Sequence, residues 1–124
     1  MSNDAELVVR WLDAFNRRDA EDLLEVAHPA LVLRPMRWVE RREYRGHAGI
    51  REWLEAIQAS PHATTVNVDR VHAIAPGRVM VEGTIDDGHA TPFTALYVIR
   101  DGRLASVQAY MSDRALLEQL GMID

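Results

Sequence analysis

A change of hydrophobic pattern near Thr64 divides this sequence into two parts with different folding tendencies. Before this point apolar residues recur at helical spacing, and after it runs rich in β-branched residues are separated by tight-turn signals. Those signals are Ala75-Pro76-Gly77, Asp86-Asp87-Gly88 and Arg100-Asp101-Gly102. They predict four antiparallel strands, spanning about Thr64 to Ile74, Arg78 to Asp86, Thr91 to Arg100 and Arg103 to Met111.

The part before Thr64 predicts three amphipathic helices. The first follows a cap at Ser2 or Asn3, and its apolar face consists of Leu7, Val8, Trp11, Leu12 and Phe15. Asp19 caps a short second helix, which ends at His28-Pro29 because a residue that precedes proline disfavours helical geometry. The third follows Gly46-His47, and its apolar face consists of Ile50, Trp53, Leu54 and Ile57.

Shorter elements complete the expected order. We expect brief strands at Leu31 to Arg34 and at Met36 to Val39, and a last helix from its cap Asp113 to Leu120. The chain is then a single α+β domain, residues 1–124, in which the helices pack on one face of a curved sheet.

Composition excludes several function classes. The sequence has no cysteine, which excludes disulfides, thiolate nucleophiles and cysteine-ligated metals. Its five histidines form no HxH or HxxxH pair, so we expect no metal, and no nucleotide-binding or nucleophile motif points to a cofactor. A net charge of −5 argues against a nucleic-acid or membrane partner. Without an apolar leader or spanning segment, we expect a cytoplasmic protein.

The strand predicted at Thr91 to Arg100 has no charged residue on either side up to Ile99. Phe93, Ala95, Tyr97 and Ile99 share one side, and Thr94, Leu96 and Val98 share the other. A sheet with one face in water alternates more cleanly between apolar and polar residues. A homodimer through the sheet is therefore expected, and a flattened monomer is the alternative.

Three segments together resemble a known family. They are LVVRWLDAFNRRD from Leu7, YRGHAGIREWL from Tyr44, and RDGRLASVQAYMSDRALLEQLG from Arg100. In combination they resemble SnoaL-like proteins of the nuclear transport factor 2-like superfamily. The resemblance implies a cystatin-like α+β roll, in which a cone-shaped, curved antiparallel sheet wraps around the N-terminal helices and an apolar pocket, commonly in a dimer.

The catalytic positions of two enzymes in this superfamily are occupied by other residue types. The tyrosine, the base aspartate and the second acid of ketosteroid isomerase correspond to Trp11, Arg34 and Ala95. An arginine cannot take a proton from carbon at neutral pH. The arginine and the two aspartates of limonene epoxide hydrolase correspond to Phe93, Ala95 and Ala109. Neither mechanism transfers to this chain.

The resemblance also implies which residues line the pocket: Trp11, Trp38, Trp53, Met80, Tyr97, Gln108 and Tyr110. Such a pocket suits a small hydrophobic molecule with one or two polar groups. The alternative for the aromatic residues is plain core packing, because aromatics at helical spacing also form cores.

The candidate catalytic residues are Glu82, His72 and Arg34. If Met80, Glu82 and Thr84 face the pocket, Glu82 or His72 acts as base and Arg34 holds a ligand oxygen by two hydrogen bonds. If instead Val79, Val81 and Ile85 face inward, Glu82 points to water. The first arrangement predicts cofactor-free proton transfer or aldol-type cyclisation on a carbonyl compound. The alternatives are a non-catalytic ligand-binding or accessory protein and a purely structural dimerisation module.

Overall fold

The computed structural model describes residues 3–34, 43–59, 65–86 and 90–110. Within these ranges it has three helices and six strands. The helices are α1 (Asn3–Arg17), α2 (Ala20–Val26) and α3 (Gly46–Ala59). The strands are β1 (Ala27–Arg34), β2 (Tyr44–Arg45), β3 (Thr65–Ala75), β4 (Arg78–Asp86), β5 (Ala90–Arg100) and β6 (Arg103–Tyr110). The predicted strand at Met36 to Val39 and the predicted helix at Asp113 to Leu120 lie outside the described residues.

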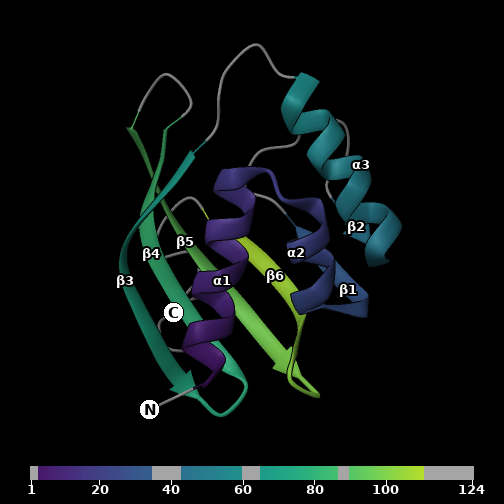
Figure 1. Ribbon diagram of the computed structural model, residues 1–124. Coiled ribbons are helices and arrows are strands. Elements are labelled where there is room, and N and C mark those ends of the chain that lie inside the picture. Colours follow the sequence, from purple (N-terminus) through teal and green to yellow (C-terminus); the bar gives the residue numbers. More distant parts are fainter. Residues whose placement is uncertain (1–2, 35–42, 60–64, 87–89, 111–124) are drawn as a thin grey trace.

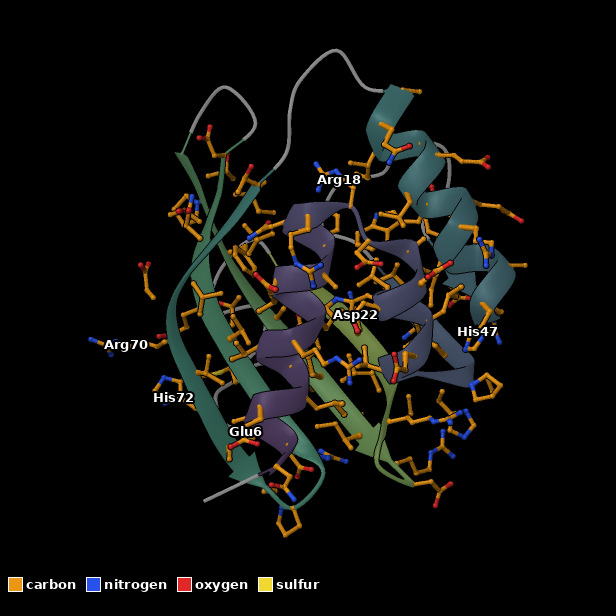
Figure 2. All side chains as sticks on the ribbon, in the orientation of Figure 1. Glu6, Arg18, Asp22, His47, Arg70 and His72 are labelled. Carbon is orange, nitrogen blue, oxygen red and sulfur yellow. The ribbon has the colours of Figure 1, made fainter. Side chains whose placement is uncertain are left out.

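The junction between α1 and α2 follows the predicted capping chemistry. Arg18 adopts a left-handed backbone, with φ of 58°, and its N–H donates to the Phe15 carbonyl at 3.0 Å, which ends α1. Asp19 is the N-cap of α2, and its carboxylate accepts from the Asp22 backbone N–H at 3.1 Å. The Asp22 carboxylate lies between the two helices and pairs with Arg10 of α1 (Figure 2). This Arg10 hydrogen bond is the main cause that lowers the pKa of Asp22 below its usual value.

The six strands form one curved sheet in the order β2-β1-β6-β5-β4-β3. The four strands that follow residue 64 pair as the predicted antiparallel meander. The pairing of β1 with β6 is parallel, which differs from the expected wholly antiparallel sheet. It joins β1, the first described strand, to β6, the last strand in the described part of the chain.

Strand β1 begins at Ala27, earlier than the predicted start at Leu31. Pro29 lies inside it, and the pairing with β6 shifts register between Ala27 and Val32. Proline cannot donate to a strand ladder, and such an irregular segment accommodates the missing N–H. The helix boundary predicted from His28-Pro29 is therefore close, whereas the strand boundary is wrong.

The turn signals work as expected in the β5–β6 hairpin. Asp101 and Gly102 have positive φ angles of 55° and 74°, as a type I′ turn requires. Gly77, between β3 and β4, has φ of 75°, and its N–H donates to Asp4 of α1 at 3.0 Å. This hydrogen bond ties the start of α1 to the β3–β4 turn.

All three helices lie on one face of the sheet, and β3 curves around α1 (Figure 1). The hydrophobic core fills the layer between them, with Val8, Leu23, Ile50, Val81 and Leu104 among the fully buried side chains. The end of α1 is fixed to the edge strand by Asn16. Its side-chain amide donates to the Val66 carbonyl and accepts from the Val66 N–H, both at 2.9 Å. Asn16 thus occupies backbone groups that an edge strand otherwise leaves open.

In the described part of the chain, no helix is long and apolar enough to cross a membrane.

Candidate functional site

The sheet has two faces with different contents. The inner face packs against the helices, and the outer face lies on the opposite side. Val79 and Val81 of β4 are completely buried in the core on the inner face. Because successive side chains of a strand point to opposite faces, Met80 and Glu82 lie on the outer face. The strand registers extend this assignment across the sheet, since Val81 pairs with Ala95 and Met80 pairs with Leu96.

Three aromatic side chains from two helices form a stack against the inner face. Phe15 and Trp53 have ring centroids 4.9 Å apart, and Trp11 and Trp53 are nearly parallel with centroids 6.1 Å apart. The Arg18 guanidinium lies 4.4 Å above the Phe15 ring. Burial lowers the pKa of Arg18, but the residue stays a cation because an arginine titrates far above neutral pH. We call Trp11, Phe15 and Trp53 the aromatic stack.

The buried residues include polar groups, among them those of Trp53 and Tyr97. The indole Nε1 of Trp53 is buried and has no hydrogen-bond partner in the described structure. Such an unpaired donor costs about 1–3 kcal/mol relative to one that is bonded. The Tyr97 phenol of β5 is buried as well, and burial raises its pKa above the usual value. At neutral pH the phenol is therefore a neutral hydrogen-bond donor.

The middle of the inner face carries small side chains. Val81, Ala95 and Ala109 pair across β4, β5 and β6 in one row. Ala109 is partly exposed and packs against the same core cluster. Within the described ranges no charged side chain is buried, so an inner site there offers apolar surface and neutral donors.

His72 and Glu82 come together on the outer face, as two of the predicted catalytic residues. His72 Nε2 lies 3.7 Å from a Glu82 carboxylate oxygen, and both side chains are partly exposed. Figure 2 shows His72 and its neighbour Arg70 pointing away from α1. The two titratable groups of the predicted mechanism are thus adjacent, but they lie on the face opposite the aromatic stack.

Arg34, the third predicted catalytic residue, is separated from that pair. It lies on β1, and β6 and β5 come between β1 and β4, which places the two backbones about 14 Å apart. Its Nε donates to Glu43 at 2.9 Å, and Glu43 also accepts from Arg45 at 2.6 Å. These two hydrogen bonds, that from Arg45 first, lower the pKa of Glu43. Arg34 is exposed and does not meet Glu82 or His72.

The predicted pocket residues divide between the two faces. Trp11, Trp53 and Tyr97 are buried in the interior. Met80 and Gln108 lie on the outer face, where Met80 pairs with Leu96 and Leu96 pairs with Gln108. Trp38 lies outside the described residues. Tyr110 ends β6 opposite Thr94, and its side chain is not described. The pocket role of these residues stays a prediction.

Sequence reasoning passed over two residues of this interior as site residues. Phe15 follows Trp11 by four residues on one helix face, and that spacing could have placed it in the aromatic stack. Ala95 occupies a position where related enzymes carry a catalytic acid, and its small side chain lies in the middle of the inner face.

The described residues contain no group of three histidine or acidic side chains that could hold a metal ion.

Comparison with solved structures shows the same fold in several proteins. TerC, crystallised with polyporic acid, is 21% identical over 97% of this chain and 99% of its own, with a TM-score of 0.77. A proposed polyketide cyclase from Xanthomonas campestris is 21% identical over 95% of this chain and 96% of its own, with a TM-score of 0.74. A proposed ketosteroid isomerase from Kribbella flavida is 16% identical over 86% of this chain and 76% of its own, with a TM-score of 0.69.

Among curated proteins, none matches this chain. The model of the SnoaL-like domain matches residues 8–107, which include most of α1, all of α2 and α3, and most of the sheet. The resemblance predicted from three short segments is confirmed by this match and by the solved structures. The chain belongs to the SnoaL-like domain family.

Proposed function

We propose that this protein binds a small hydrophobic molecule between its helices and the inner face of the sheet. The aromatic stack is the observation that carries the proposal, because it places three flat apolar rings beside the unpaired Trp53 N–H. Ligand sites combine mostly apolar walls with a few polar groups that orient the ligand. The row of small side chains at Val81, Ala95 and Ala109 supports the same location.

Binding fits the inner face better than acid–base catalysis does. Proton transfer from carbon needs a base within hydrogen-bonding reach of the substrate. The described candidates, His72 and Glu82, lie on the outer face, and Arg34 is paired with Glu43. Tyr97 and Trp53 can donate to a carbonyl oxygen, but neither is a base at neutral pH.

A cofactor-free isomerase or aldol cyclase is the second candidate function. The fold shared with proposed polyketide cyclases favours it, and a buried donor such as the Trp53 N–H could stabilise a developing enolate. A shared fold alone does not assign a reaction. The two candidate functions are therefore distinguished by whether the protein converts its ligand into a product. A binding protein returns its ligand unchanged, whereas a cyclase or isomerase alters it.

The test is a titration with bicyclic and tricyclic aryl ketones, namely 1-tetralone, 9-fluorenone and anthrone. Binding is followed by tryptophan fluorescence and by thermal melting, and the recovered ketone is analysed by mass spectrometry and NMR. We expect saturable binding of at least one ketone and its recovery unchanged. A chemically altered ketone favours the enzyme, and no saturable binding of any of the three contradicts both candidates.

Matched variants locate the site. Ala95→Leu adds volume on the inner face, and we expect it to weaken binding at least about tenfold by excluding the ligand. Leu96→Met changes the next residue, on the outer face, and we expect unchanged affinity. Ala109→Val supplies a second inner-face variant, and circular dichroism verifies that each protein folds. Equal binding by inner-face and outer-face variants would place the ligand elsewhere.

A further inference from the structure

We infer that the indole N–H of Trp53 selects the ligand, and that the ligand is an uncharged molecule with a carbonyl-type hydrogen-bond acceptor. The inference rests on the proposed function and adds to it a chemical class and a specific donor. Ketones, quinones, enones and esters share the required acceptor oxygen.

The first support is the state of Trp53 itself. Its Nε1 is buried without a partner in the described part of the molecule, although buried polar atoms nearly always have one. An indole nitrogen only donates, so its partner must be an acceptor. The ring is packed against Phe15 at 4.9 Å and Trp11 at 6.1 Å, which holds the N–H in one direction. The chain therefore keeps a fixed donor unsatisfied in an apolar interior.

The second support is the absence of buried charge around this donor. None of the described charged side chains is buried in the core. A charged ligand placed in the core would lose its hydration, and the described residues supply no fully buried counter-charge for it. The Arg18 guanidinium, 4.4 Å from the Phe15 ring, is only partly buried and keeps contact with water. The Tyr97 phenol, another buried polar group among the described residues, stays protonated because burial raises its pKa. Both groups suit a neutral acceptor oxygen.

An unpaired donor also makes the site selective. A ligand of the same shape without the acceptor leaves the Trp53 N–H unsatisfied, whereas a carbonyl oxygen at hydrogen-bonding distance pairs with it. The expected preference is about tenfold in affinity, the usual value of one buried hydrogen bond.

The test compares 1-tetralone with tetralin, which has the same two rings without the carbonyl oxygen, and with the anion 1-naphthoate. Dissociation constants are measured by calorimetry for the unaltered protein, Trp53→Phe and Trp11→Phe. Trp53→Phe keeps an aromatic ring and removes the donor, whereas Trp11→Phe alters the aromatic stack and keeps it. We expect 1-tetralone to bind about tenfold more tightly than either other compound, Trp53→Phe to abolish the preference over tetralin, and Trp11→Phe to retain it.

A measurement on the unaltered protein guards against a variant that does not fold. In the ¹H–¹⁵N spectrum, the Trp53 indole signal is identified by nuclear Overhauser contacts to Phe15, its nearest ring partner. We expect 1-tetralone, but not tetralin, to move this indole proton downfield, as a new hydrogen bond does. Tight binding of both compounds without that shift, or a preference that persists in Trp53→Phe, overturns the donor role and leaves the binding function standing. If neither compound binds, the binding function and the donor role both fail for this ligand class.

Discussion

The two faces of one sheet differ in kind although the same strands supply both. The inner face is closed by the helices and presents buried apolar residues with the Tyr97 phenol. The outer face presents the titratable pair of His72 and Glu82, with half-buried Met80 and Leu96 beside it. The contrast teaches that residue type alone does not locate chemistry in such a fold. A carboxylate and an imidazole that are adjacent in space still serve no inner site when they lie on the other face.

Neighbouring residues on opposite faces give the largest expected contrast. Leu33 is 2% exposed on the inner face of β1, and Leu33→Ala should lower the free energy of unfolding by about 2–5 kcal/mol through lost burial and a cavity. Arg34→Ala removes an exposed ion pair with Glu43 and should cost less than about 1 kcal/mol. Urea unfolding followed by circular dichroism measures both. Equal losses in the free energy of unfolding for the two variants would contradict this difference between the two faces.

Gly83 tests how closely the strands approach on the inner side of β4. A Cβ at this position would lie 2.1 Å from the Asn67 carbonyl oxygen and 3.2 Å from the Phe93 ring. Because that oxygen belongs to the backbone, Gly83→Ala must displace β3, and we expect a loss of about 1–3 kcal/mol. Gly102→Ala is the control, since nothing lies within 4 Å and the positive φ alone should cost about 1 kcal/mol. A smaller loss for Gly83→Ala than for the control would contradict the close approach.

The outer face tests the predicted homodimer. Leu96 lies in its middle, between Met80 and Gln108, and Leu96→Glu would place a charge where two sheets meet. Light scattering coupled to gel filtration should show the unaltered protein at twice the 14.0 kDa chain mass and the variant at that mass. Val9→Glu, at an exposed site on α1, should leave the mass unchanged. An unaltered protein that already elutes as a monomer contradicts the dimer.

The smallest effect is expected at the outer-face ion pair. Glu82→Gln and His72→Gln each remove a partly exposed pair, whose contribution to stability is at most about 1 kcal/mol. Since both residues face away from the aromatic stack, ketone affinity should stay within about twofold of that of the unaltered protein. Such a change in binding free energy is less than about half of the contribution of one hydrogen bond. Fluorescence titration of the two variants measures this. A tenfold loss in either variant would return Glu82 or His72 to the binding site.

The order of elements could be read from the sequence because local signals mark it. Asp101-Gly102 specifies a hairpin turn through its positive φ angles, and Asp19 caps α2 through its own backbone neighbours. Those interactions span a few residues. The parallel pairing of β1 with β6, by contrast, joins segments that are far apart in the sequence. No local pattern in Leu31 to Arg34 predicts a parallel partner.

The faces of β4 were harder to predict than its ends. Alternation along the strand favours Val79, Val81 and Ile85 pointing inward, whereas the family resemblance favours Met80 and Glu82. In the structure Val79 and Val81 are buried. The helices cover their side of β4, and a Glu82 carboxylate placed there would lose its hydration without a partner. The unpaired state of Trp53 could not be predicted at all, because it depends on which acceptors the folded chain brings near Nε1.

The pairing of β1 with β6 has a consequence for how the protein forms on the ribosome. Leu33 lies opposite Val107, so the ladder that joins β1 to the rest of the sheet closes only when nearly all of the described chain has been synthesised. Until then α1, α2 and β1 emerge with their apolar sides uncovered, as segments of high contact order do. The apolar surface of the nascent N-terminal half therefore stays uncovered until β6 has been synthesised. A chain stalled on the ribosome before β6 would expose this surface to chaperones and proteases.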